Sequence, residues 1–349
     1  MTLALKFDIM LRMENLELDK YINDKELNRL ADFLLDIKNP IYVNGHINTD
    51  YDSICSGVLL AYLLNSVGKK ATMLFSFDAK ILYDRVKQDD YDDFISTTFS
   101  APKTDYTGIL VDMNSTYRAS FEDMFLNAQT KINIDHHDNN KMECDIKYVD
   151  ENAGANCENI LKLAIILEKK TGKKLINSYF CKLLSMGIIT DTSNIVKSTN
   201  LEQTEWAINI IKSFDVDTDE IANLVYLNLN NEQLEIFEKT IDSKKVYDYI
   251  SYYFIEENNL KNDVIHNDYA MVLSRIIKID SNPIVLYEQR KDNESIWEFR
   301  SNDIKKFPVN EIALMLGGGG HKNASGATIT DKSPKQVVEA FLKYYKNRK

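Results

Sequence analysis

Aspartates and a histidine follow apolar runs in the N-terminal half of this 349-residue chain. The loop GHINTDYDSICSG contains His46, Asp50 and Asp52, and Asp112 ends the run GILVDM. Carboxylate and imidazole groups are ligands of divalent cations, so residues of these types at this spacing can converge on a metal ion. Each aspartate taken alone could instead cap a turn or the start of a helix.

A second set of such residues lies further along the chain. Asp135, His136 and His137 end the run KINIDHH, and Asp191 follows the apolar run GIIT. Because neighbouring side chains diverge, we expect His136 and His137 to have different roles, one as a metal ligand and the other facing the substrate. Two histidines in a polar surface turn are the alternative interpretation.

The mixture of aspartate and histidine indicates which metal and which chemistry to expect. It suits Mn²⁺, with Mg²⁺ or Co²⁺ as alternatives, better than structural Zn²⁺, which normally recruits cysteine. The carboxylates are numerous enough to hold two cations. Two cations ~3.5–4 Å apart can activate a water molecule and stabilise the charge that develops in phosphoryl transfer. The sequence therefore predicts a hydrolase of phosphoester bonds with a pair of divalent metal ions.

A glycine-rich segment near the C-terminus, GGGGHKNASGA (317–327), is a candidate for binding the substrate. Its amides can cradle a phosphate, and a histidine and a lysine add cationic donors. An arginine and a serine upstream could hold a phosphate through paired hydrogen bonds. A flexible turn without a ligand is the alternative. The predicted substrate-binding residues are Arg300, Ser301, Gly318, Gly319, Gly320, His321, Lys322 and Ser325.

Strand patterns alternate with helical patterns in the first half of the chain, which predicts an α/β fold with a parallel sheet flanked by helices. In such a fold, ligands bind at the carboxyl ends of the strands, where the aspartates and histidines stand. Strands are expected at 41–45, 71–77, 108–113 and 131–137, and helices at 16–38, 52–67, 156–170 and 174–189.

The C-terminal part has a different pattern. Residues 201–242 read as helical and acidic, and strand-like runs follow: VYDYISYYFI, YAMVLSRIIKI, PIVLYEQ and SIWEFRS. We therefore expect a metal-binding domain over 1–212, a helical linker over 213–245 and a smaller α+β substrate-binding domain over 246–349. The active site is expected in the cleft between the domains.

Composition narrows the class of protein. With 42 basic and 53 acidic side chains, the net charge of −11 argues against a surface for long nucleic acids. A metal pair can still attract a small anionic substrate. The four cysteines form no CxxC pair, and neither a secretory signal nor an apolar run of ~18 residues is seen. These features predict a cytoplasmic protein with reduced thiols and no membrane partner, and they leave a homodimer open.

These motifs resemble those of the DHH phosphoesterase superfamily. The 46–52 loop matches its first motif, Asp112 its second, Asp135-His136-His137 its third and Asp191 its fourth, in the same order. The segment GGGGHKNASGA resembles the signature of the type 1 DHH-associated C-terminal domain. One departure is a threonine before Asp50, where the family usually has proline, but it removes no ligand.

The resemblance implies a role for each site residue. One metal would have three ligands and the other four, with Asp112 bridging the pair. The two ligand sets are His46, Asp50, Asp112 and Asp52, Asp112, His136, Asp191. His137 would contact the scissile phosphate or assist the leaving group, and Asp135 would orient a neighbouring histidine.

The same resemblance implies short nucleotide substrates. Within the superfamily, the type 1 C-terminal domain points to bifunctional oligoribonucleases (nano-RNases), which act on nanoRNA and linear dinucleotides, and to 3′-phosphoadenosine 5′-phosphate phosphatases. Cyclic dinucleotide phosphodiesterases, inorganic pyrophosphatases and exopolyphosphatases are the alternatives. A catalytically silent nucleotide-binding protein is a further one.

Overall fold

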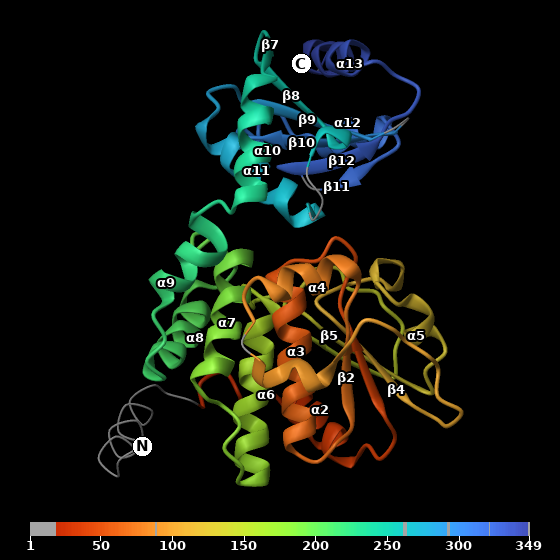
Figure 1. Ribbon diagram of the computed structural model, residues 1–349, viewed down its shortest axis with the longest axis vertical. Helices are drawn as coiled ribbons and strands as arrows, with labels where there is room; N and C mark the ends of the chain where they lie inside the picture. Colours follow the sequence, from red (N-terminus) through yellow and green to blue (C-terminus); the bar gives the residue numbers. More distant parts are fainter. Residues whose placement is uncertain (1–18, 88, 261–263, 292–293, 321, 348–349) are drawn as a thin grey trace. The chain divides into compact units, whose positions relative to one another are not determined.

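The structure is a computed structural model that describes residues 19–87, 89–260, 264–291, 294–320 and 322–347. The chain forms two compact units, Met1–Asn228 and Leu229–Lys349 (Figure 1). The separate linker predicted over 213–245 and the cleft predicted between the domains stay predictions.

The first unit is built on a six-stranded sheet in which neighbouring strands are parallel, in the order β3-β2-β1-β4-β5-β6. Successive residues such as Leu110 and Val111 are both buried because helices cover both faces. The predicted parallel sheet flanked by helices is therefore confirmed. The strands are β1 (Ile41–Asn44), β2 (Ala71–Leu74), β3 (Ile95–Ser96), β4 (Thr107–Val111), β5 (Thr130–Asp135) and β6 (Ile146–Val149).

Successive side chains of β4 point to opposite faces of the sheet, and α3 covers one of these faces while α5 covers the other (Figure 1). Val111 contacts α3 at Gly57, whereas Leu110 points the other way and packs with Met124 of α5. The helices of this unit are α2 (Lys25–Asp36), α3 (Tyr51–Ser66), α4 (Phe77–Asp84), α5 (Glu122–Leu126), α6 (Asn156–Thr171), α7 (Ser178–Asp191), α8 (Leu201–Ser213) and α9 (Thr218–Ala222), with the short turns η1 (Asp89–Phe94), η2 (Thr116–Arg118) and η3 (Asn223–Leu227).

Several predicted boundaries in the first unit are wrong, among them the start of the helix predicted over 174–189, which begins at Ser178. The first helix begins at Lys25 rather than at residue 16, because the side chain of Asp24 caps it by accepting hydrogen bonds from two amides of its first turn. Residues 16–18 lie outside the described part of the chain. The second strand ends at Leu74, since the Ser76 hydroxyl caps α4 and turns the chain into a helix.

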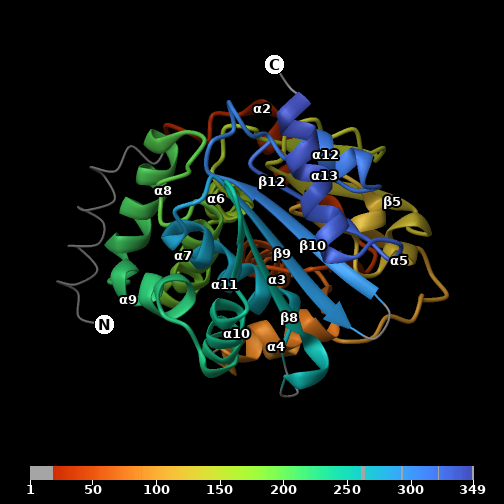
Figure 2. The ribbon, with the colours of Figure 1, turned by 90° about the horizontal axis from the view of Figure 1, so that it is seen from above.

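The second unit has its own sheet, in the order β11-β12-β10-β9-β8-β7, in which only the β8–β9 pair is parallel among the described strands. Leu286 packs with Phe341 of α13 on one face, and Tyr287 packs with Leu273 of α11 on the other (Figure 2). The strands are β7 (Lys245–Tyr247), β8 (Ile250–Glu256), β9 (Ile284–Lys291), β10 (Glu294–Ser301), β11 (Gly319–Gly320) and β12 (Ala324–Thr328). The helices are α10 (Asn231–Asp242), α11 (His266–Ile279), α12 (Asn310–Met315) and α13 (Pro334–Asn347), with the turn η4 (Glu257–Asn259).

The run YAMVLSRIIKI (269–279), predicted as a strand, is helical and belongs to α11. Its buried residues Tyr269, Val272, Leu273 and Ile276 recur at helical spacing and face the sheet. The run is rich in β-branched and aromatic residues, which favour strands, and the strand prediction followed this composition. The helical spacing of its apolar residues instead matches the observed structure. The mixed helix-and-strand architecture predicted for the C-terminal part is nevertheless confirmed.

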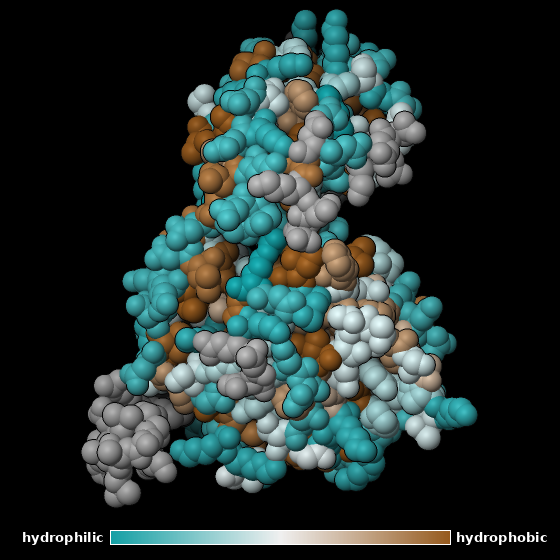
Figure 3. Space-filling view, in the orientation of Figure 1, coloured by the Kyte–Doolittle hydropathy of each residue, from teal (hydrophilic) through white to brown (hydrophobic). Residues whose placement is uncertain are grey.

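Among the described residues, no helix combines the length and the apolar composition that crossing a bilayer requires. On the face that Figure 3 shows, hydrophilic and hydrophobic side chains are interspersed over the first unit. The predicted cytoplasmic location stays a prediction.

Candidate metal centre

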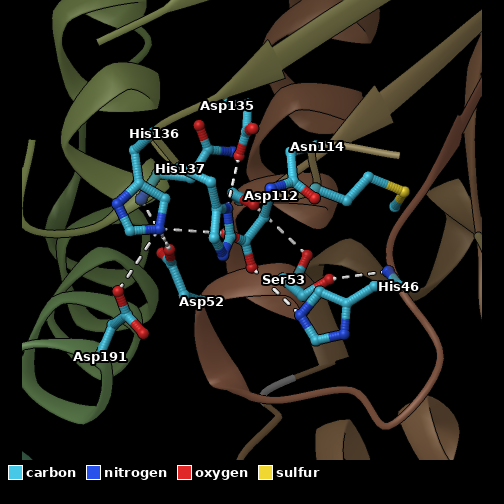
Figure 4. Close-up of polar contacts among 12 residues, drawn as sticks. His46, Asp52, Ser53, Asp112, Asn114, Asp135, His136, His137 and Asp191 are labelled. Atoms are coloured by element: carbon cyan, nitrogen blue, oxygen red, sulfur yellow. Dashed lines mark hydrogen bonds and ion pairs between the residues drawn. The ribbon is translucent and has the colours of Figure 1, made fainter. Parts of the chain in front are cut away.

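The predicted ligands of the first unit lie together at the carboxyl end of its sheet (Figure 4). His46 follows β1, and Asp50 is the N-cap of α3. One oxygen of Asp50, Oδ1, accepts a hydrogen bond from the amide of Ser53 at 3.0 Å. The other, Oδ2, lies 3.6 Å from Nε2 of His46. Asp50 can therefore cap the helix with one oxygen and offer the other to a cation.

Asp112 lies at the middle of the cluster. Its Oδ2 is 3.3 Å from Nε2 of His46, and its Oδ1 is 3.3 Å from Nε2 of His136. The residue is 2% exposed and has a φ of 59°. A non-glycine residue in the left-handed region carries a conformational cost, which aspartate tolerates better than most. The backbone thus turns the two oxygens of one carboxylate toward different histidines, as a bridging ligand requires.

A second group of three residues lies on the other side of Asp112. Nε2 of His136 is 3.8 Å from Oδ2 of Asp52 and 3.4 Å from Oδ2 of Asp191. In each of the sets His46–Asp50–Asp112 and Asp52–His136–Asp191, the ligand atoms lie within 4.8 Å of one another. Asp191 reaches this group as the last residue of α7, which continues two residues beyond the helix predicted over 174–189.

The main chain fixes the orientation of both histidine rings. Nδ1 of His46 lies 2.7 Å from the carbonyl of Ile47, and Nδ1 of His136 lies 3.1 Å from the carbonyl of Ala153. Because a carbonyl only accepts, Nδ1 carries the proton in both rings. Each Nε2 then faces the carboxylates, and once it loses its proton it offers a metal ion a lone pair. The donor set of carboxylate oxygens and imidazole nitrogens fits two divalent cations.

The pKa shifts of the clustered side chains indicate an excess of negative charge at the site. Burial by itself lowers the pKa of His46 and of His136, yet the surrounding carboxylates raise both, that of His136 to about 11. Burial raises the pKa of Asp52, and other aspartates raise it further. Burial also opposes ionisation of Asp112, but its contacts with the two histidines hold its pKa well below the usual value. Divalent cations would take the place of the protons that compensate this charge.

Asp135 does not face the other ligands and instead holds His137. Its Oδ1 lies 2.7 Å from Nδ1 of His137, and its Oδ2 accepts a hydrogen bond from the side-chain Nδ2 of Asn140 at 2.6 Å. Both carboxylate oxygens are thus engaged. His137 is left with Nε2 for another contact, although its Nδ1 also lies 3.8 Å from Asp112. Asn140 was not predicted, because a lone asparagine in a polar loop has no distinctive local pattern.

The N-terminus of α6 and Gly187 of α7 position the side chain of Asp52. Its Oδ2 accepts from the amide of Asn156 at 2.6 Å and its Oδ1 from the amide of Cys157 at 2.9 Å. A Cβ added at Gly187 would lie 2.8 Å from Oδ1 of Asp52 and 2.4 Å from Sγ of Cys157. These supporting residues were also missed, since they come from distant segments of the sequence.

Replacing Gly187 with Ala should weaken metal binding at the Asp52–His136–Asp191 group. Alanine favours a helix interior by ~0.5–1 kcal/mol over glycine, which offsets part of the ~1–3 kcal/mol that overpacking typically costs, so the variant should fold. Its methyl group would displace the Asp52 carboxylate, and we expect Mn²⁺ affinity at one of two sites to fall by about 10–100-fold, as when outer-shell support is lost. Isothermal titration calorimetry with Mn²⁺ measures this.

Ser185→Ala is the matched control on the same helix, because the Ser185 hydroxyl donates to the carbonyl of Lys182 within α7. It should leave both affinities unchanged. If Gly187→Ala also left them unchanged, the proposed steric support of Asp52 would be wrong.

The backbone geometry of the C-terminal glycine run explains why glycine is required at some of its positions. A Cβ at Gly318 would lie 1.9 Å from the carbonyl oxygen of Gly326, and Gly320 has a φ of 132°. Close pairing of β11 with β12 therefore requires glycine at both positions. This requirement is independent of any phosphate.

Several predicted substrate-binding residues gather around this β-hairpin. The Arg300 guanidinium pairs with Glu298 and donates to the carbonyl of Ser325 at 3.5 Å. The amide of Ser301, which ends β10, donates to the carbonyl of Asn323 at 3.0 Å. The carbonyl of Lys322 accepts from the amide of Val309 at 2.9 Å, and His321 lies outside the described residues.

Comparison with known proteins identifies the family. The model of the DHH family, N-terminal domain, matches residues 40–188, and the DHHA1 domain matches residues 242–348. The bifunctional oligoribonuclease and PAP phosphatase NrnA of Mycoplasma genitalium is 29% identical over 238 residues, which are 66% of this chain and 70% of that protein.

Solved structures share the fold. An exopolyphosphatase-related protein from Bacteroides fragilis has a TM-score of 0.74 at 21% identity, covering 94% of this chain and 97% of that chain. RecJ of Thermus thermophilus in complex with Mn²⁺ has a TM-score of 0.56 at 14% identity, covering 94% of this chain and 56% of that chain. The predicted resemblance is confirmed, and the chain belongs to the DHH family, with a DHH N-terminal domain followed by a DHHA1 domain.

Proposed function

We propose that this protein is a two-metal phosphoesterase that hydrolyses short oligoribonucleotides, including linear dinucleotides, and also 3′-phosphoadenosine 5′-phosphate. The observation that carries the proposal is the pair of ligand groups that Asp112 joins, with His46 on one side and His136 on the other. The similarity to NrnA of Mycoplasma genitalium supports the substrate class.

The metal that fits best is Mn²⁺, with Mg²⁺ or Co²⁺ as alternatives. Imidazole nitrogen together with carboxylate oxygen suits these ions, and the described ligand groups contain no cysteine. The Mn²⁺ complex of RecJ, which shares the fold, supports the choice. Bound as a pair, such cations supply activation of the attacking water and stabilisation of the charge on the phosphoryl oxygens.

The other residues of the site would act on the substrate. Asp135 orients the His137 ring through Nδ1, so that Nε2 can donate a proton or a hydrogen bond to the phosphate or its leaving group. In the DHHA1 domain, Arg300, Ser325 and the glycine-rich hairpin would bind a terminal phosphate or nucleotide. His321 and Lys322 belong to the same proposed binding segment.

A turnover panel in Mn²⁺ tests the proposal. Linear dinucleotides and 3′-phosphoadenosine 5′-phosphate should be hydrolysed faster than longer oligoribonucleotides, cyclic dinucleotides and pyrophosphate. A preference for cyclic dinucleotides would indicate a cyclic dinucleotide phosphodiesterase instead. A preference for pyrophosphate or polyphosphate would indicate a pyrophosphatase or an exopolyphosphatase, which needs no base recognition.

Replacing Asp135 with Asn should move the alkaline limb of the pH–rate profile to lower pH. Burial lowers the pKa of His137, but its hydrogen bond to Asp135 and the charge of Asp112 raise that pKa above the ordinary value. His137 donates only when protonated, so kcat falls as pH rises through its pKa. Without the Asp135 charge the pKa is lower, and the fall begins at lower pH.

The profile of kcat across the neutral and alkaline range, with metal content measured in parallel, checks this prediction. Metal content should stay as in the wild type, because both oxygens of Asp135 are engaged away from the two ligand groups. An alkaline limb at the same pH in both proteins would contradict the proposed coupling of Asp135 to His137.

A further inference from the structure

A pocket opens beside the metal centre within the first unit. Its volume of about 780 Å³ is in the range of small-molecule sites, ~300–1,000 Å³. One of its lining residues is Asn114, two residues after Asp112 along the chain. It extends past η2 and the end of α5 to the residues before β6. None of its lining residues belongs to the two ligand groups, so the site described above does not account for it.

Tyr117 is the most exposed aromatic residue of this pocket. Its side chain is 74% exposed, although large apolar rings are usually covered. In the described part of the chain, neither a hydrogen bond nor another ring holds it in place. A free ring next to a site for nucleotide hydrolysis is the kind of surface on which a nucleobase stacks.

The rest of the pocket also fits a nucleoside. Phe125 and Met142 are buried and provide an apolar floor. The ammonium groups of Lys131 and Lys141 form no ion pair with any carboxylate of the described residues, so they are available to a phosphate. The carboxylate of Glu143, on the same wall, can accept from the exocyclic amino group of a base.

The mixed charge of the pocket argues against a bare polyanion. Glu143 and Asp145 would repel pyrophosphate or polyphosphate, and in the described part of the chain Asp145 accepts from the main-chain amide of Lys131 at 2.8 Å without an ion pair to the Lys131 ammonium group. Such an anion would also gain nothing from the ring of Tyr117. A nucleoside would bind more tightly because it can contact the ring of Tyr117, the apolar side chains of Phe125 and Met142, and the carboxylate of Glu143.

We propose that this pocket binds one nucleoside of the substrate, with its base stacked on Tyr117 and an adjoining phosphate near Lys131 and Lys141. The inference rests on the proposed function, because it names the part of the substrate that the first unit recognises. It places base recognition beside the metal centre, in addition to the phosphate-binding segment proposed in the DHHA1 domain.

Replacing Tyr117 with Ala should raise KM for a linear dinucleotide about tenfold, the order expected for loss of one base–ring stack, with kcat nearly unchanged. Tyr117→Phe keeps the ring and should leave KM at the wild-type value. Phe77→Ala is the matched control, since Phe77 is also 74% exposed but does not line the pocket. An unchanged KM in Tyr117→Ala, or an equal rise in Phe77→Ala, would overturn the proposal.

Binding of adenosine 5′-monophosphate to the metal-free protein in EDTA separates this inference from the proposed function. Because the pocket shares no residue with the ligand groups, calorimetry should detect binding that Tyr117→Ala weakens about tenfold and Phe77→Ala leaves intact. Equal affinities of the wild type and Tyr117→Ala would overturn the inference whatever the enzyme hydrolyses. Weakened binding by Tyr117→Ala together with a wild type that leaves dinucleotides intact would support the pocket and refute the proposed substrate.

Discussion

Asp112→Asn should reduce turnover by about 10²–10³-fold, the order seen when one group that stabilises transition-state charge is removed. The substitution keeps the shape of the side chain, and asparagine tolerates the left-handed backbone at this position, where φ is 59°. What is lost is one negative charge and one acceptor between His46 and His136, both 3.3 Å away. A neutral amide cannot bridge two cations as a carboxylate does.

Metal content and thermal stability distinguish this effect from misfolding. Asp112→Asn should bind fewer than two Mn²⁺ ions per chain by elemental analysis while its melting temperature stays at or above that of the metal-free wild type. Asp219→Asn, the same change at an exposed position of α9, should leave both turnover and metal content unaltered. Near-normal Mn²⁺-dependent turnover by Asp112→Asn would refute the bridging role.

His137→Ala should lower kcat by about 10²–10⁴-fold, the usual contribution of a general acid or base, while two Mn²⁺ ions remain bound. The separation of chemistry from metal binding follows from the geometry. Nδ1 of His137 is held by Asp135 at 2.7 Å, whereas His46 and His136 each direct Nε2 at the carboxylates. The His137 ring is therefore placed to act on the substrate.

The competing role for His137 is as a metal ligand, because it also forms a cluster with Asp112 and His136. Loss of one Mn²⁺ ion in His137→Ala would favour that role over general acid catalysis. His266→Ala provides the control, since His266 lies at the start of α11 in the second unit. It should change neither kcat nor metal content.

Much of the candidate site could be predicted because its residues end local patterns. Asp112 and Asp135 each close an apolar strand, and parallel strands bring such ends to one edge of a sheet. The carboxylates and imidazoles that the structure brings together there are those that the spacing of the sequence singled out. Continuous apolar runs also predicted the strands β1, β4 and β5 closely.

What could not be predicted depends on contacts between distant segments. Gly187 leaves room for Asp52, and the amides of Asn156 and Cys157 hold that carboxylate, although more than a hundred residues separate them in the sequence. The strand β6 was missed as well, because Lys147 interrupts its residues, Ile146–Val149, so that they form no continuous apolar run. The pocket beside Asn114 is likewise assembled from three separate segments, none of which has a motif.

Anomalous diffraction from crystals grown with Mn²⁺ tests the two-metal centre most directly. We predict two peaks ~3.5–4 Å apart. One should lie against His46 and Asp50, the other against Asp52, His136 and Asp191, with a carboxylate oxygen of Asp112 on each. A single peak, or peaks that leave Asp112 uncoordinated, would contradict this arrangement.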